Sequence, residues 1–325
     1  MHIKLLLPTV LLSLTAATLC SAAAIDNDPI AVTRRLKPAV GTVTTPDGTV
    51  LSYRLFNHTQ PSYANATPVI FVSGLGQVQT DWDALIPHFT KKHPVLAFDN
   101  RGIGLSTVTN SSLVTRQNMG NDIHELIKHF GWTHINLVGI SMGAIVSNTF
   151  MASDFTDVQV DHLVLIAGAY KDSSTGPLIQ DVGRWLESFS TTPPPASEWK
   201  AFIHKLMLAC LTPDYVNTHP SRIRQFLRQV DQGKGRTYEK FIVQAGAMGQ
   251  YDLSESLKGY EARGVKTMVM HGKLDVAIPV EVGRAMSELI GGGITYKEYP
   301  DGGHVLYETD PESVEDIVAF LDGEE

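Results

Sequence analysis

The stretch INLVGISMG, residues 135–143, decides the fold of this chain. Residues 135–138 form a short apolar run, as expected of a strand buried on both faces of a parallel sheet. Residues 142 to about 152 have the composition of a helix. A Gly-x-Ser-x-Gly pattern between strand and helix is typical of a tight turn that exposes the serine hydroxyl. Ser141 is therefore the predicted nucleophile, and the alternative is a turn with a structural role only.

Outward from this stretch, the chain alternates between short apolar runs and segments with helical spacing. Helical spacing is found at residues 81–89 and 119–130, and a last helix is expected from Asp310 to about Leu321. A hairpin around Pro46-Asp47-Gly48 precedes them. This alternation predicts a mostly parallel, eight-stranded sheet with helices on both faces. The expected strands are residues 40–44, 49–56, 69–72, 95–98, 135–138, 163–167, 265–270 and 294–299.

The alternation stops between about residues 170 and 260. This segment has no clear strand pattern and is rich in large apolar side chains such as Trp185, Trp199 and Phe202. We therefore expect a helical insertion that forms a lid over the edge of the sheet carrying Ser141.

A serine nucleophile needs a base, and the base needs an orienting acid. The chain resembles the α/β-hydrolase family from about Val40 to Leu321. In that family the acid follows the serine and the histidine comes last. The loop GKLDVAIP, residues 272–279, resembles the acid loop and implies Asp275. Of the 12 histidines, only His304, in a Gly-Gly-His loop, follows Asp275. Asp172 is the alternative acid, because some members of the family place the acid after the earlier strand, which is expected here at residues 163–167.

The expected oxyanion hole needs two backbone N–H donors. Met142, directly after the serine, supplies one. The loop SGLG, residues 73–76, is similar to the His-Gly-x-Gly loop of the family, with serine in place of histidine. The resemblance implies that Leu75 supplies the second donor.

The resemblance implies a serine hydrolase that cleaves a carboxylic ester of an apolar small molecule through an acyl-enzyme. The alternatives are a lactonase or a cofactor-free perhydrolase on the same triad, and a ligand-binding or receptor member without turnover. No cofactor or metal is expected. His124 and His129 are five residues apart and would not share one face of a helix. The net charge of −8, without a dense basic stripe, argues against nucleic acid as a partner.

The N-terminus indicates export. A signal peptide over residues 1–24 is predicted from Lys4, the apolar run after it and the small residues that end at Ala24. One α/β-hydrolase domain is expected over residues 25–325. No later segment is apolar enough to span a membrane. We expect a secreted protein, extracellular or periplasmic depending on its source. Three sequons make Asn57, Asn65 and Asn110 possible glycosylation sites.

Overall fold

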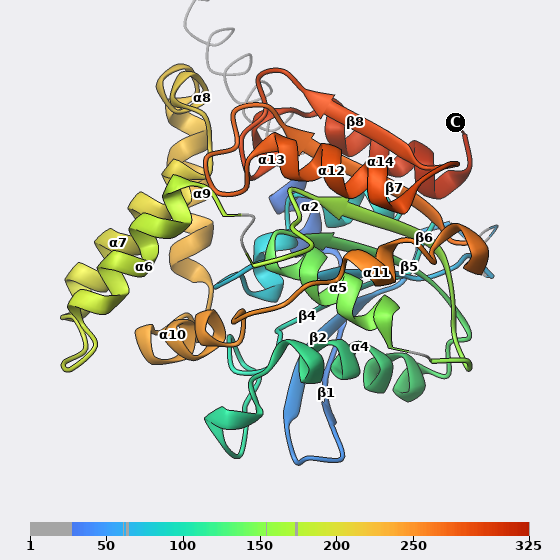
Figure 1. Ribbon diagram of the computed structural model, residues 1–325, viewed down its shortest axis with the longest axis horizontal. Helices are drawn as coiled ribbons and strands as arrows, with labels where there is room; N and C mark the ends of the chain where they lie inside the picture. The colour runs from blue at the N-terminus through green and yellow to red at the C-terminus, as the bar shows by residue number, and fades with distance from the viewer. Residues whose placement is uncertain (1–27, 61, 63–64, 154, 173–174, 325) are drawn as a thin grey trace, which may run out of the picture.

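The computed structural model describes residues 28–60, 62, 65–153, 155–172 and 175–324, and the predicted signal peptide lies outside them. Its centre is one eight-stranded sheet with the order β1-β2-β4-β3-β5-β6-β7-β8 (Figure 1). β2 runs antiparallel to β1 and β4, and the other neighbours pair in parallel. This confirms the predicted fold class. The strands are β1 (Ala39–Thr44), β2 (Val50–Phe56), β3 (Val69–Val72), β4 (Val95–Phe98), β5 (His134–Ile140), β6 (Gln159–Ile166), β7 (Lys266–Gly272) and β8 (Thr295–Tyr299).

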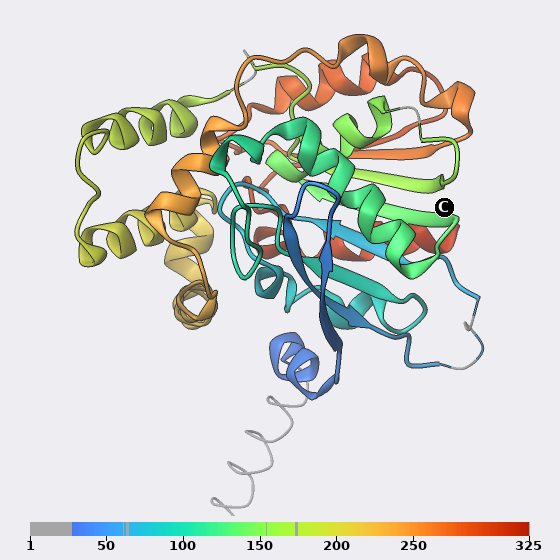
Figure 2. The ribbon, with the colours of Figure 1, turned by 90° about the horizontal axis from the view of Figure 1, so that it is seen from below.

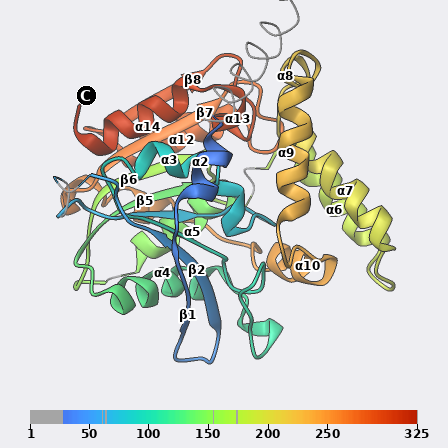
Figure 3. The same cartoon turned by 180° about the vertical axis from the view of Figure 1, so that it is seen from behind.

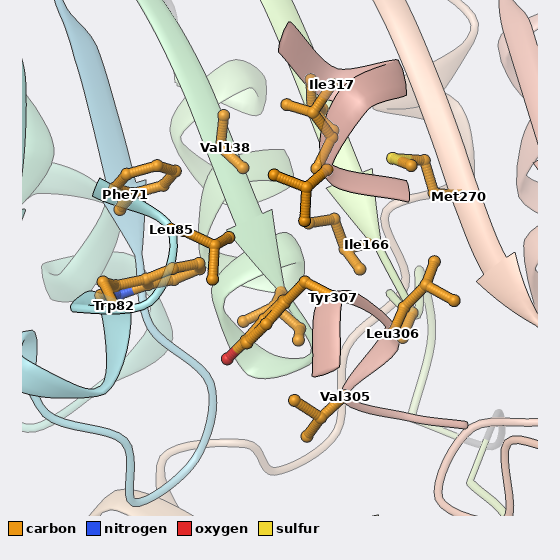
Figure 4. Packing of buried hydrophobic residues seen from close by; sticks show 14 of the residues in the cluster. Phe71, Trp82, Leu85, Val138, Ile166, Met270, Val305, Leu306, Tyr307 and Ile317 are labelled. Atoms are coloured by element: carbon orange, nitrogen blue, oxygen red, sulfur yellow. The ribbon is translucent and has the colours of Figure 1, made fainter. Parts of the chain in front are cut away.

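The central strands are buried on both faces, which explains their continuous apolar runs. All four residues of β3 are fully buried, and successive side chains enter opposite core layers: Phe71 joins one cluster and Ile70 the other. Figure 4 shows the first layer, where Phe71 and Trp82 stack with ring centroids 4.5 Å apart. Because both faces are buried, these strands have no polar face, and their sequences do not alternate between apolar and polar residues.

Helices cover both faces of the sheet, as Figures 1 and 3 show. One face carries α2 (Pro29–Arg35), α3 (Ile86–Phe89), α13 (Leu306–Thr309) and α14 (Glu312–Asp322), and the other carries α4 (Arg116–Phe130), α5 (Met142–Ala152), α11 (Ser254–Leu257) and α12 (Val280–Ile290). The predicted single helix at residues 81–89 is wrong. The chain instead forms a 3₁₀ turn, Gln79–Trp82, and then α3. Pro87 has no N–H to continue a helix from the preceding turn, so it is accommodated in the first turn of α3.

Five helices between β6 and β7 stand to one side of the sheet, away from its two helical layers (Figure 2). They are α6 (Pro177–Ser188), α7 (Ala196–Ala209), α8 (Pro213–Thr218), α9 (Pro220–Gln232) and α10 (Tyr238–Gly246). We call this group the helical insertion. An aromatic cluster holds it together, in which Trp185 stacks on Phe202 with ring centroids 3.7 Å apart.

Candidate active site

Ser141 occupies a strained turn between β5 and α5. Its backbone has φ 55° and ψ −121°, a conformation that L-residues rarely adopt. The turn is tight: a Cβ on Gly139 would lie 2.6 Å from the carbonyl oxygen of Gly143, and one on Gly143 would lie 2.0 Å from that of Val72. Both glycines are therefore needed for the turn to form. The result is a half-buried Ser141 at the N-terminus of α5, where the helix dipole favours negative charge.

Asp275 and His304 form a buried pair. Nδ1–H of His304 donates to Oδ2 of Asp275 at 2.7 Å, and the carboxylate side chain is fully buried. Its Oδ1 accepts the backbone N–H groups of Ala277 (2.8 Å) and Ile278 (2.9 Å). Burial alone would raise the pKa of Asp275. The positive charge of His304 and the hydrogen bonds to the carboxylate outweigh it and hold that pKa well below its usual range.

A second histidine touches the same carboxylate. His271, at the end of β7, is fully buried, and its Nε2 lies 2.8 Å from the carbonyl oxygen of Ile278 and 3.3 Å from Oδ2 of Asp275. Its contact with the carboxylate depends on the fold of the 272–279 loop, which no local pattern reveals.

Asp172 is placed elsewhere. It is exposed, its backbone N–H donates to the carbonyl oxygen of Tyr251, and it does not line the pocket that contains Ser141. The structure therefore brings Asp275, and not Asp172, together with His304.

Ser141 and His304 line one small cavity of about 50 Å³. Among the described residues, neither the Ser141 hydroxyl nor Nε2 of His304 has a hydrogen-bond partner. The rest of the wall is mostly apolar and comes from both the sheet edge and the helical insertion: Leu75, Gln77, Ile140, Leu178, Ile179, Val182, Leu206, Met207, Cys210, Ala277 and Val305. Burial and the negative charge of Asp275 raise the pKa of the Cys210 thiol to about 12, so this cysteine stays protonated and unreactive.

The loop after β3 presents the second expected oxyanion donor. Gly74 N–H donates to Oε1 of Gln77 at 2.7 Å, and Gly76 N–H donates to Oε1 of Gln244 at 2.8 Å. Between them, the N–H of Leu75 has no acceptor among the described residues, nor does that of Met142. Gln77 and Gln244 were not identified from sequence.

β3 and β5 are the strands that carry Leu75 and Ser141 at their carboxyl ends. They are neighbours at the point where the strand order reverses, since β4 lies on the other side of β3. Ligand sites in open α/β sheets form at such a point. The fold therefore brings Ser141 and the Leu75 loop together.

A larger groove adjoins the cavity. It has a volume of about 600 Å³, lies between α6 and α7, and shares Leu178, Val182 and Leu206 with the cavity. Trp185 and Phe202 form part of its wall, while Asp181, Arg184, Glu198 and Lys205 add charges of both signs.

The chain belongs to the alpha/beta hydrolase fold family, whose model matches residues 67–311. The esterase RhEst1 from Rhodococcus sp. ECU1013 has a similar structure, with a TM-score of 0.71 and 19% identity over 87% of this chain and 98% of that one. The enol-lactonase from Burkholderia xenovorans LB400 has a TM-score of 0.70 and 22% identity over 87% and 100%.

A curated relative covers less of the chain. "Putative carbamate hydrolase RutD" of Escherichia coli O9:H4 is 29% identical over 86 residues, which are 26% of this chain and 32% of that protein. The match thus spans about a third of the relative's length.

The remaining sequence predictions concern the surface. Asn57, Asn65 and Asn110 are exposed, so their side chains are accessible. Within the described part of the chain, every helix is too short or too polar to cross a membrane.

Proposed function

We propose that this protein is a serine hydrolase of carboxylic esters, with Ser141 as nucleophile, His304 as base and Asp275 as orienting acid. The observation that carries the proposal is the shared cavity: a strained, unpartnered Ser141 faces the same space as a histidine whose other nitrogen is bound to a buried carboxylate. A nucleophile, a base and an orienting acid are the parts that acyl transfer requires.

The proposed mechanism follows from this arrangement. The Ser141 oxygen attacks the acyl carbonyl while Nε2 of His304 takes its proton, and the N–H groups of Leu75 and Met142 stabilise the oxyanion. His304 then protonates the leaving alcohol, which leaves an acyl-enzyme on Ser141. Water, deprotonated by His304, attacks the ester of the acyl-enzyme and releases the acid. Asp275 keeps Nδ1 protonated, so that Nε2 is free to act as base.

The mostly apolar walls of the cavity and of the groove support an apolar substrate. The 50 Å³ cavity admits a small group only, while the adjoining 600 Å³ groove can hold a longer apolar part. Each CH₂ buried there contributes roughly 0.8 kcal/mol. A lactone is the second candidate, because the structure resembles that of an enol-lactonase and a cyclic ester needs no second compartment for its alcohol.

A fluorophosphonate probe combined with an ester series tests the proposal. We expect stoichiometric labelling at Ser141, located by peptide mass, and steady release of alcohol from p-nitrophenyl esters or acid from lactones. A perhydrolase would in addition need a peracid product with hydrogen peroxide. Labelling elsewhere would refute Ser141 as nucleophile, and a single burst without turnover would indicate a ligand-binding member of the fold.

We further propose that the protein is exported. The charged and apolar pattern of residues 1–24 supports it, and the exposed positions of Asn57, Asn65 and Asn110 are compatible with glycans. N-terminal sequencing of protein from the culture medium of a eukaryotic host should find Ile25 or a close neighbour first. Digestion with an endoglycosidase should then lower the mass. Retention of Met1 in intracellular protein would contradict export.

A further inference from the structure

The loop that carries Leu75 is held by the helical insertion at both backbone polar groups of one residue, Gly76. Gly76 N–H donates to Oε1 of Gln244 on α10 at 2.8 Å, and Gly76 C=O accepts from Nε of Arg236, just before α10, at 2.7 Å. Gly76 has φ +72°, and a Cβ there would lie 2.7 Å from the ring of Phe241, also on α10. The backbone next to Leu75 is therefore fixed by residues about 160 positions further along the chain.

Both side chains are buried. Gln244 is fully buried, and the side chain of Arg236 is 4% exposed. The guanidinium of Arg236 also donates to the carbonyl oxygen of Val230 at the end of α9 and to the carboxylate of Asp81. That carboxylate accepts Val78 N–H at 2.9 Å. Arg236 therefore joins the insertion to two points of the loop after β3.

We propose that Arg236 and Gln244 are positioning residues of the oxyanion hole, a proposal that rests on the function proposed above. They hold Gly76 so that the preceding N–H, that of Leu75, faces the cavity without an internal acceptor. A donor fixed in advance stabilises the oxyanion without reorganisation during the reaction. The insertion then has two roles: α6 and α7 form the groove for substrate, and α10 with the segment before it fixes a donor for the transition state.

Arg236→Met and Gln244→Leu each remove one of the two bonds to Gly76. Loss of a whole oxyanion donor costs about 10²–10³-fold in kcat, so a loosened donor should cost about 10–100-fold. We expect KM for a p-nitrophenyl ester to change little, because the bond acts on the transition state. The affinity for a boronic acid, whose tetrahedral adduct places an oxygen in the hole, should fall by a similar factor.

Lys240→Met is the matched control. Lys240 also lies on α10 and joins it to the core, but its ammonium donates to the carbonyl oxygens of Gly104 (2.7 Å) and Ser106 (3.3 Å), not to the Leu75 loop. We expect wild-type kcat and boronic acid affinity in this variant.

Equal kcat in Arg236→Met, Gln244→Leu and Lys240→Met would overturn the positioning role, as would a rise in KM at unchanged kcat. If the first two variants do not fold, as judged by thermal unfolding, Arg236→Lys decides, because it keeps the charge beside Asp81 but not the fork of donors. A wild-type kcat for that variant would reject the proposal. Wild-type enzyme without ester or lactone turnover would instead refute the proposed function, and the oxyanion hole with it.

Discussion

The carboxyl edge of the sheet and the helical insertion form opposite walls of the same cavity, yet they are built differently. At the sheet edge, backbone geometry places the proposed catalytic groups: a strained turn at Ser141 and a loop that closes on Asp275 through its own N–H groups. In the insertion, side-chain packing places the walls of the groove, as in the stack of Trp185 on Phe202. We infer that the edge determines whether the reaction occurs, and that the α6–α7 part of the insertion determines which substrate reacts.

The strongest test of this division is Ser141→Ala. It should lower kcat by about 10³–10⁶-fold and abolish fluorophosphonate labelling. The thermal midpoint should not fall, since alanine removes one oxygen and leaves the turn intact. Steady-state kinetics and calorimetry measure the two effects. Wild-type turnover in this variant would place the chemistry outside the sheet edge.

Asp275→Asn should have the next largest effect. Asparagine keeps the shape but favours the wrong tautomer of His304, and we expect kcat to fall on the order of 10⁴-fold. His304→Ala should cost nearly as much as Ser141→Ala, because the residues of the proposed triad are expected to act as a unit. Asp172→Asn is the control, and its exposed side chain predicts little change. The reverse ranking of the two aspartates would move the acid to the loop after β6.

The contrast between edge and insertion also explains what could be predicted from sequence. β3, β4 and α5 have the bounds expected from their apolar runs, and the glycines around Ser141 follow from steric needs of one local turn. The contacts of Gln244 and Arg236 join residues 168 and 160 positions apart, and nothing near them in the chain marks such contacts. Local constraints are visible in a single sequence, whereas long-range hydrogen bonds appear only once the fold is known.

The carboxyl of Asp275 should not contribute to the acid limb of the pH profile. The pKa of Asp275 lies below its usual range, so this carboxyl is ionised wherever the enzyme works. The acid limb of kcat/KM should therefore be no steeper than a single protonation, about tenfold per pH unit. A limb with twice that slope would contradict an Asp275 that stays ionised.

The lowered pKa of Asp275 also makes the stability of the fold depend on pH. Because the pKa of Asp275 is lower in the folded state than in the unfolded state, the ionised carboxylate stabilises the fold at pH values above its unfolded pKa of about 4. This contribution is lost as the pH falls from there towards the folded-state pKa. Thermal midpoints of wild type should therefore drop more steeply below pH 4 than those of Asp275→Asn. Parallel curves would contradict the depressed pKa.

The smallest effect is expected in the groove. Trp185→Ala removes a wall from the α6–α7 groove but not from the cavity at Ser141. A wall that buries one or two CH₂ groups contributes about 0.8 kcal/mol for each, so kcat/KM for octanoate esters should fall about tenfold while that for acetate stays constant. Wild type should prefer increasing acyl length until the groove is filled, and then lose activity. Trp132→Ala is the matched control, since Trp132 stacks on Phe130 and lines neither the cavity nor the groove. An equal loss on acetate and octanoate would mean that the α6–α7 part of the insertion also acts on the chemistry and does not select the substrate, which would contradict the role inferred for it.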